Sequence, residues 1–423
     1  MHICNMDGQG GAAIGAYGLH RAMIRLGIDS KMLVIRKVTD DPTVSQVGRY
    51  RRRARNWLRR AEKLLLLLER TSDTTLRTLN IFPTGIHRLI NQSDADIVQL
   101  HWIGIHTISI GEIAKIKKPV VWKMPDMWPF CGAEHYSYPE KNSRFIEGYN
   151  RHNRPRANTG LDLNKWVWRY KKWCWKRKRI HIVGTSTWIA SCARESYLFR
   201  NQSIRVINNP IDLDLFRPTG KIQARQRLGL QAGKKIVLFG SWHVERDRRK
   251  GYDKLLQAMK ILQKSWKPEE IVLLVFGTDK KPELTYSDTG VYEDYFQEKF
   301  LGELGQNELL RDAYNAADVY VTPSLLESFG LTAAESLACG TPVVCFDTSG
   351  LRDIVDHEVN GYRARCYDPD DLANGINWIL RQEGTQFGEY SREKAERSFS
   401  SDTAVKKYIE FYEDILTQDS SNA

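Results

Sequence analysis

Residues 323–346 read PSLLESFGLTAAESLACGTPVVCF and hold two glutamates, Glu327 and Glu335, on either side of a glycine-containing loop. The pattern predicts a strand end, a loop at Gly330, a helix from about Leu331 to Cys339, and a further strand. Glycine lets backbone approach a ligand closely, and the unpartnered amides of a helix N-terminus favour a phosphate. Glu335, one turn into the helix, leans back toward that end. The two carboxylates are therefore suited to accepting hydrogen bonds from hydroxyl groups beside a bound phosphate.

Strands and helices alternate along most of the chain, which indicates parallel sheets. At 423 residues the chain is too long for one ordinary core, and the alternation breaks at NNPIDLDLF (208–216). We therefore expect a domain boundary near 205–218 and a helix near Tyr252–Gln263. The predicted strands are His2–Asn5, Lys31–Ile35, Ile97–Leu100, Val120–Trp122, Ile180–Val183, Ile204–Ile207, Lys235–Phe239, Ile271–Phe276, Val319–Val321 and Val343–Phe346.

The 323–346 stretch resembles the EX7E motif of retaining family 4 glycosyltransferases, which have the GT-B fold. The resemblance implies an α/β protein with two Rossmann-like parallel-sheet domains facing a central cleft, and a C-terminal helix that crosses back to the first domain. The expected parts are an acceptor-binding domain at 1–207, a linker at 208–218, a nucleotide-sugar-binding domain at 219–398, and the returning helix with a frayed tail at 399–423.

The resemblance also assigns roles around this motif. Glu327 would lie beside the donor sugar and Glu335 would bind the ribose. The backbone at Phe329, Gly330 and Leu331 would hold the pyrophosphate. The alternative is an ordinary βαβ unit with two surface glutamates, because Glu-x7-Glu alone is common in helical proteins.

A pyrophosphate leaving group also needs positive charge, from a metal or from Arg and Lys. In GSWHVERDRRKGYDKLL (240–256), Arg249-Lys250-Gly251 resembles the lysine-containing phosphate loop of the family. Arg246, Arg248 or Arg249 would supply the family's arginine, and the alternative is a solvated charged loop. No metal and no cofactor beyond the nucleotide sugar is expected. Asp212-Leu213-Asp214 looks like a DxD metal motif, but we interpret it as a connector, because NNPIDLDLF resembles the domain-linking string of the family.

The glycines of DGQGGAA (7–13) follow the first strand, and Gly8-x-Gly10-x-x-Ala13 matches a weak dinucleotide-binding pattern. A dehydrogenase should carry an acid at the end of the second strand, where Arg36 stands instead. We expect Gly10 and Gly11 to let a phosphate or acceptor approach the first helix. They could also simply form a tight turn.

Two further strings, LHW (100–102) and DMWPFCGAEHYS (126–137), resemble bacterial exopolysaccharide and O-antigen glycosyltransferases of the colanic-acid type. That subgroup usually has a histidine where Pro125 stands here. Asp126, His101 and His135 are therefore the candidates for positioning the acceptor, and internal hydrogen bonding is the alternative for each.

The net charge of +12 lies in two segments. Residues 49–70 carry +7 and residues 164–180 carry +8, which leaves the rest of the chain at −3. Segment 49–70 is typical of a basic amphipathic helix suited to anionic headgroups. In the second segment Trp166 and Trp173 share one helix face and Trp168 and Trp175 lie nearly opposite, so one pair is expected in the core. Solvated helices are the alternative, and no nucleic-acid-binding motif accompanies the charge.

The remaining features favour a cytoplasmic protein at the inner face of the membrane. Seven scattered cysteines without a CxxC pair indicate a reducing compartment and argue against a zinc site. Met1–Asn5 leads directly into a strand, so we expect no secretory leader. The expected function is transfer of a sugar from a nucleotide-diphosphate donor to a lipid-linked or growing saccharide acceptor. A nucleotide-sugar epimerase, a sugar phosphorylase and a non-catalytic binding relative are the alternatives.

Overall fold

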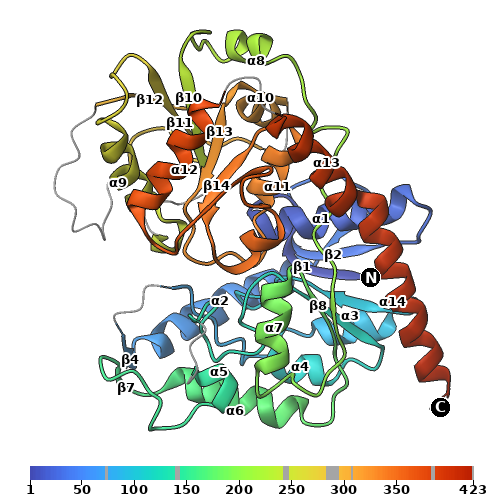
Figure 1. Cartoon of the computed structure of the whole chain (residues 1–423). Helices are drawn as coiled ribbons and strands as arrows, with labels where there is room; N and C mark the ends of the chain where they lie inside the picture. The colour runs from blue at the N-terminus through green and yellow to red at the C-terminus, as the bar shows by residue number, and fades with distance from the viewer. Residues whose placement is uncertain are drawn as a thin grey trace. The chain divides into compact units, whose positions relative to one another are not determined.

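The computed structural model describes residues 1–71, 75–138, 143–241, 247–282, 295–305, 308–382 and 386–421. The chain forms two compact units (Figure 1). Unit 1 comprises Met1–Asn208 and Ala404–Ala423, and unit 2 comprises Asn209–Thr403. Each unit is built on one main parallel sheet, which confirms the predicted fold class.

The sheet of unit 1 has seven strands in the order β3-β2-β1-β5-β6-β8-β9. All six pairings between neighbours are parallel. Six of these strands confirm predicted ones, with bounds shifted by one or two residues, whereas β3 was not predicted. The strands are β1 (His2–Met6), β2 (Met32–Arg36), β3 (Val44–Gln46), β5 (Val98–Leu100), β6 (Val120–Met124), β8 (His181–Gly184) and β9 (Ile204–Val206).

Helices bury both faces of this sheet, so neighbouring strand residues enter different cores. Ile3 joins a cluster with helices α3, α4, α6 and α7, whereas Cys4 faces α1. A two-stranded antiparallel ribbon, β4 (Glu69–Arg70) with β7 (Thr159–Gly160), lies outside the sheet. The helices are α1 (Gly11–Arg25), α2 (Arg49–Leu66), α3 (Ile86–Gln92), α4 (Ile110–Ala114), α5 (Arg144–Glu147), α6 (Leu163–Trp175), α7 (Thr187–Glu195) and α14 (Ser401–Ser421).

The C-terminal helix α14 returns to unit 1. Its buried residues Tyr408, Phe411 and Ile415 pack with Leu19 and Met23 of α1, and with Val121 and Val183 of the sheet. Figure 1 shows α14 as the long helix at the end of the chain.

The sheet of unit 2 has six parallel strands in the order β12-β11-β10-β13-β14-β15. The predicted strands at 235–239, 271–276, 319–321 and 343–346 are confirmed, and the other two strands were not predicted. The strands are β10 (Lys235–Gly240), β11 (Ile271–Phe276), β12 (Gln297–Phe300), β13 (Val319–Thr322), β14 (Val343–Phe346) and β15 (Gly361–Ala364).

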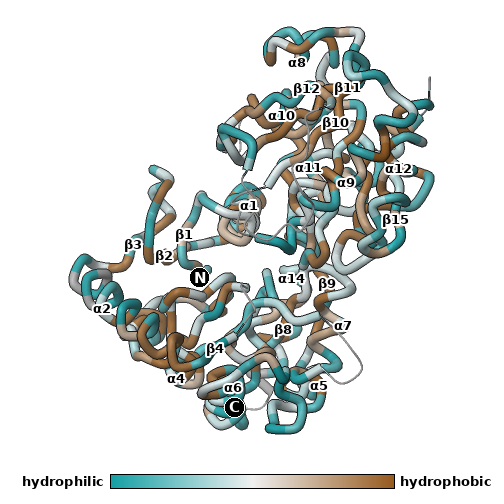
Figure 2. Tube along the Cα trace, turned by 90° about the vertical axis from the view of Figure 1, so that its left-hand side faces the viewer, coloured by the Kyte–Doolittle hydropathy of each residue, from teal (hydrophilic) through white to brown (hydrophobic). Residues whose placement is uncertain are grey.

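Both faces of the second sheet are also covered. Ile236 and Leu238 of β10 pack with α8, α10 and α11, whereas Val237 and Phe239 pack with α9 and α12. This two-sided burial explains why β10 and β11 are almost continuously apolar, as the brown tube in Figure 2 shows. The helices are α8 (Lys221–Arg227), α9 (Tyr252–Leu262), α10 (Glu308–Ala316), α11 (Leu331–Ala338), α12 (Pro369–Arg381) and α13 (Phe387–Phe399), with 3-10 turns η1 (Arg248–Lys250) and η2 (Ser349–Asp353).

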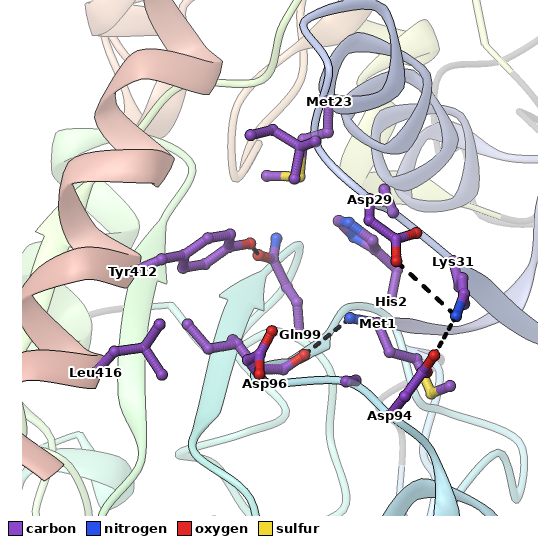
Figure 3. A pocket seen from close by; sticks show the side chains of 14 residues that line it. Met1, His2, Met23, Asp29, Lys31, Asp94, Asp96, Gln99, Tyr412 and Leu416 are labelled. Carbon is purple, nitrogen blue, oxygen red and sulfur yellow. Dashed lines mark hydrogen bonds and ion pairs between the residues drawn. The ribbon is translucent and has the colours of Figure 1, made fainter. Parts of the chain in front are cut away.

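A cavity of about 180 Å³ lies in unit 1 beside α14, lined by Gln99 and Tyr412 among other residues (Figure 3). The Tyr412 hydroxyl donates to Gln99 Oε1, and Lys31 pairs with Asp94 on its far side. His2 and Gln99 place the cavity near the amino ends of β1 and β5. Gly10 and Asp126 instead follow carboxyl ends of strands, so this cavity is separate from the candidate site described below.

Packing of α14 gives a stability prediction. Phe411 is buried in the cluster with α1, so Phe411→Ala should lower the free energy of unfolding by about 3–5 kcal/mol. The exposed neighbour Lys407 provides the control, because Lys407→Ala should change it by less than about 0.5 kcal/mol. Urea denaturation followed by circular dichroism measures both, and equal effects would contradict the assigned packing.

Candidate active site

Glu327 and Lys250 form a direct ion pair in unit 2. Lys250 Nζ, at the end of η1, donates to Glu327 Oε1 over 2.6 Å. The Ser324 hydroxyl donates to the same oxygen over 3.1 Å, and Arg249 Nη1 lies 3.7 Å from it. Glu327 sits in the loop between β13 and α11. The loop after β10 and the loop after β13 thus meet at one carboxylate, as expected for neighbouring parallel strands.

The backbone around Glu327 is held from the loop after β14. The Glu327 amide donates to Ser349 Oγ over 2.9 Å, and the Gly350 amide donates to the Glu327 carbonyl over 2.8 Å. Ser349 is buried and has a φ of +50°, a left-handed conformation that is uncommon for a non-glycine residue. A side chain at Gly350 would approach the Ser328 carbonyl oxygen to 2.6 Å. Both contacts fix the position of the glutamate.

Burial and charge act in opposite directions on Glu327. Burial would raise the pKa of its carboxyl group, but the charges of Lys250 and Arg249 and the hydrogen bonds from Lys250 and Ser324 outweigh that effect. The pKa therefore lies below its ordinary value, and Glu327 is a carboxylate at neutral pH.

Arg249 is fixed by the protein itself. Its guanidinium donates to the Leu326 carbonyl over 2.9 Å and to Asp247 Oδ2 over 2.7 Å. Its own carbonyl accepts from the Leu325 amide over 2.7 Å. Arg248 is exposed, and Arg246 lies outside the described residues. Lys250, on the same turn, is half-buried. Of these cations, it is the one hydrogen-bonded to Glu327.

Gly330 forms the turn into α11. Its φ is +105°, and a Cβ there would lie 2.8 Å from Leu351 Cδ2, so the turn requires glycine. Leu331 begins the helix, and the amides of the first turn have no intrahelical partner. The Phe329 side chain is buried against Phe399, with ring centroids 5.4 Å apart. Phe329 can therefore offer a ligand only its backbone.

Glu335 lies on α11 with only 2% of its surface exposed. Its Oε2 accepts a hydrogen bond of 2.8 Å from the hydroxyl of Tyr314 on α10. Burial, together with the nearby carboxylate, raises the pKa of Tyr314 well above its ordinary value. Tyr314 and Ser349 were not singled out from the sequence, because both lie outside the motif and are distant from the glutamate that each contacts. Ser324 lies within the motif, but no role was assigned to it.

Unit 1 carries a second cluster, around Asp126 after β6. His135 Nδ1 and Asp126 Oδ2 are 2.6 Å apart, and the Trp102 indole donates to the same oxygen over 2.8 Å. The Thr78 hydroxyl is hydrogen-bonded to His135 Nε2. Asp126 and His135 are both buried. The structure thus brings together two of the three predicted acceptor-side residues.

The third, His101, belongs to a different pair. Its Nε2 lies 2.8 Å from Nδ1 of His2, and both rings are buried. Burial, followed by the charge of Lys123, holds the pKa of His101 well below its ordinary value. His101 is therefore neutral and faces the sheet interior. It orders the start of the loop that carries Trp102.

The loop 128–132 is held in place by Lys171 of α6. Lys171 is fully buried and donates to the carbonyls of Trp128, Cys131 and Gly132, the last two over 3.1 and 2.7 Å. Its Nζ also lies 3.6 Å from the centre of the Trp128 ring. Burial lowers the pKa of Lys171 to about 7. One of the cations of the second basic segment thus supports the loop that connects Asp126 and His135.

Gly10 and Gly11 form the entry to α1. Gly10 has a φ of +81° and precedes the helix, which Gly11 begins. The buried Asp7 fixes this loop, because its carboxylate accepts from the Val38 and Thr39 amides over 2.7 and 3.1 Å. The strands β1, β5 and β6 are neighbours, so this loop, Trp102 and Asp126 all follow carboxyl ends at one sheet edge.

No group of three or more His, Cys, Asp or Glu side chains suited to a metal occurs among the described residues. Asp212 of the DxD-like string instead accepts from the amides of Asp214 and Leu215 over 3.1 and 3.0 Å. Asp212 therefore stabilises a turn of the chain, which is consistent with a connector between the two units.

The low pKa of Glu327 gives a prediction about acid stability. A carboxyl whose pKa is depressed on folding stabilises the protein fully above its unfolded value of about 4.5, and this stabilisation is lost as the pH falls through the folded value. The free energy of unfolding of the wild type should therefore exceed that of Glu327→Gln at pH 7, and the difference should shrink below pH about 4.5. Glu308→Gln, at an exposed position, is the control. A difference that stays constant across this range would rule out the assigned ion pair.

Residues 221–397 match the family model described as "Glycosyl transferases group 1". A D-inositol 3-phosphate glycosyltransferase from Xylanimonas cellulosilytica is 32% identical over 219 residues, which cover 49% of this chain and 51% of the relative. The chain thus spans about half the length of the curated relatives it matches.

Solved structures are similar over nearly the whole chain. A sucrose-phosphate synthase from Thermosynechococcus elongatus has a TM-score of 0.65 at 18% identity, covering 98% of this chain and 96% of its own. HepE of Anabaena, in complex with UDP-glucose, has a TM-score of 0.62 at 17% identity and covers both chains fully, at 100%. At these identities the likeness concerns the fold, and the predicted GT-B fold is confirmed. The chain therefore has a GT-B fold whose second unit carries a group 1 glycosyltransferase domain.

Proposed function

We propose that this protein is a metal-independent, retaining hexosyltransferase that moves a sugar from a nucleotide-diphosphate donor to a lipid-linked or growing saccharide acceptor. The product would be a cell-surface polysaccharide such as an exopolysaccharide, a capsule or an O-antigen. The observation that carries the proposal is the Lys250–Glu327 ion pair, held beside the Gly330 turn into α11.

This arrangement suits a donor in which hydroxyl groups lie next to a diphosphate. The Lys250 ammonium and the amides of the first turn of α11 would hold the pyrophosphate. Glu327 would accept hydrogen bonds from the sugar hydroxyls, and Glu335, presented with Tyr314, would accept from the ribose. As the anomeric carbon–oxygen bond to the phosphate breaks, negative charge grows on the leaving group, where these donors stabilise it. As the new glycosidic bond forms, the acceptor hydroxyl gives up its proton to a phosphate oxygen of the departing nucleoside diphosphate.

Asp126 and His135 would position the acceptor hydroxyl on unit 1. The hydrogen bonds to Asp126 and Thr78 fix the orientation of the imidazole ring, and a fixed ring is what positioning requires. Gly10 and Gly11 would let the ligand approach α1. Retention rests on the resemblance of the 323–346 motif to family 4.

A lipid-linked acceptor places the reaction at the inner face of the cytoplasmic membrane. None of the helices within the described residues is long and apolar enough to cross a bilayer. We therefore propose peripheral contact of a cytoplasmic protein with an anionic membrane surface, through the basic segments of unit 1.

A second candidate acceptor follows from the curated relatives. Several of them are named D-inositol 3-phosphate glycosyltransferase, which makes a small phosphorylated polyol a distinct alternative. Transfer to inositol phosphate without any lipid would favour this alternative over the polysaccharide role.

Binding of a panel of UDP- and GDP-sugars to the purified protein tests the donor site. One donor should bind saturably, and Glu335→Ala should abolish detectable binding. Lys250→Ala should weaken the binding of the matching nucleoside diphosphate by about tenfold to a hundredfold, because a charge-assisted hydrogen bond contributes about 1.5–3 kcal/mol. Lys260→Ala, at an exposed position on α9, should leave the affinity unchanged.

Failure of every donor to bind, with and without acceptor present, would contradict the proposal and favour a non-catalytic relative. Conversion of donor without any acceptor would identify an epimerase, and a requirement for free phosphate would identify a phosphorylase.

Asp126→Asn tests the acceptor side. The variant keeps the size of the side chain but loses the charge that pairs with His135, so transfer should fall by about a hundredfold. Nucleotide-sugar affinity should remain, because the proposed donor-binding residues of unit 2 are untouched. Initial rates measure transfer, and titration with the donor measures its affinity. A parallel loss of transfer rate and donor affinity would contradict an acceptor role for Asp126.

A further inference from the structure

The β4–β7 ribbon brings the two basic helices of unit 1 together. Strand β4 follows α2 and β7 precedes α6, and the two pair through Glu69 with Gly160 and Arg70 with Thr159. The Leu161 amide continues the ladder by donating to the Leu68 carbonyl over 2.9 Å. The end of α2 is therefore adjacent to the beginning of α6 (Figure 1).

Large apolar side chains are exposed at this join. Five of these side chains have exposed fractions between 48% and 74%. We call them the α2–α6 junction: Leu64, Leu67, Leu68, Leu161 and Trp166. Trp57 on α2 and Trp173 on α6 extend the exposed surface along each helix, at 69% and 77%. Scattered single residues of this kind are ordinary, but a contiguous group marks an interaction surface.

The tryptophans of α6 divide as the helical spacing predicts. Trp168 and Trp175 are buried in the core, and Trp175 stacks on Phe199 at 6.2 Å. Because Trp168 and Trp175 fill the inner face of α6, the helical spacing leaves Trp166 and Trp173 on its outer face.

The two acids of the α2 segment are turned inward. The buried Glu62 accepts from the Leu79 amide over 2.6 Å and pairs with His106. The buried Glu69 pairs with Arg77 at 3.0 Å and approaches Arg154 at 3.8 Å. The outward charge around the junction is consequently positive.

Exposed cations lie along both helices that meet at the junction. Among the described residues, none of the following exposed side chains is paired with a carboxylate: Arg53, Arg59, Arg60, Lys63, Arg169 and Lys176. Arg60 instead lies over the ring of Trp57, 4.9 Å from its centre. Apolar and aromatic side chains among unpaired cations are the composition that an anionic lipid surface recognises.

The inner side of α2 is fixed to the rest of unit 1. Arg51 donates to the Thr84 carbonyl and Arg55 to the Ile105 carbonyl, each over 3.1 Å. Together with the contacts of Glu62, these bonds hold α2 in place as a folded element. The junction therefore exists before any partner binds.

We propose that the α2–α6 junction docks unit 1 on a bilayer containing anionic lipids, with its leucines and Trp166 in the interfacial layer and the flanking cations at the headgroups. This deepens the proposed function, on which the need for membrane contact rests, by naming the surface. Because α2 is already folded, docking adds no helix.

Vesicle sedimentation with the full chain tests the proposal. The protein should bind vesicles of phosphatidylcholine with phosphatidylglycerol, should bind phosphatidylcholine alone at least about tenfold more weakly, and should release as salt screens the charges. The double variant Leu67→Gln/Trp166→Gln should lower the affinity for anionic vesicles by about tenfold or more. The helix signal in circular dichroism should not change on binding.

Leu309→Gln/Val359→Gln is the matched control, since both residues are exposed apolar side chains of unit 2, and it should bind vesicles like the wild type. Each variant should keep the wild-type melting temperature and donor affinity, which excludes misfolding. Equal vesicle binding by the junction variant would overturn the proposal, as would binding to soluble heparin but not to anionic vesicles. Vesicle binding without sugar transfer would contradict only the proposed function, and transfer to a soluble acceptor without vesicle binding would contradict only the docking surface.

Discussion

The carboxylate of Glu327 is the group on which the candidate donor site depends. Lys250 and Arg249 approach it from η1, the Ser324 hydroxyl from the end of β13, and Ser349 holds its backbone from the loop after β14. A buried carboxylate is unfavourable without such partners. The strand order β10-β13-β14 supplies them, because it brings the carboxyl ends of these strands side by side. The site is thus a consequence of sheet topology as much as of the motif itself.

The same physical requirement shapes unit 1 in a different way. Its buried charges face backbone carbonyls more than carboxylates: Lys171 donates to three of them and Lys123 to the Gly15 carbonyl over 2.8 Å. Burial lowers the pKa of both lysines to about 7. These side chains fix loops and α1 through backbone carbonyls, whereas Asp126 and His135 are hydrogen-bonded to each other. In unit 1, Lys171 therefore holds the loop 128–132 in shape, whereas Asp126 and His135 form the candidate acceptor-binding cluster.

Much of the fold could be predicted from sequence because the strands are short apolar runs between clear turn signals. The bounds of Ile271–Phe276 and Val343–Phe346 were predicted to the residue, whereas β12, with the sequence QEKF, has no apolar pattern to detect. At the site, motifs could indicate Glu327 and Lys250 separately. Their direct contact could not be predicted, since 77 residues separate them and only the parallel pairing of β10 with β13 joins them. Tyr314 and Ser349 lie in no motif, and the pairing of His101 with His2 depends on the register of β1 with β5.

Charge counted along the sequence also differs from charge presented at the surface. The segment from Asn164 to Ile180 carries eight cations, yet Lys171 points into the core and Lys178 donates to the Ile116 carbonyl over 2.5 Å. The segment from Arg49 to Arg70 also contains Glu62 and Glu69, which lower the net charge counted along the sequence. Both glutamates are buried. Because Arg51 and Arg55 are also turned inward, the outer surface of this segment stays about as basic as its sequence. The outer surface of α6 is less basic than its sequence. Periodicity could separate the tryptophan pairs of α6, because four residues at helical spacing must divide between two faces. The joining of the two helices could not be foreseen, since it depends on a ribbon of two residues in each strand, too short to leave a pattern.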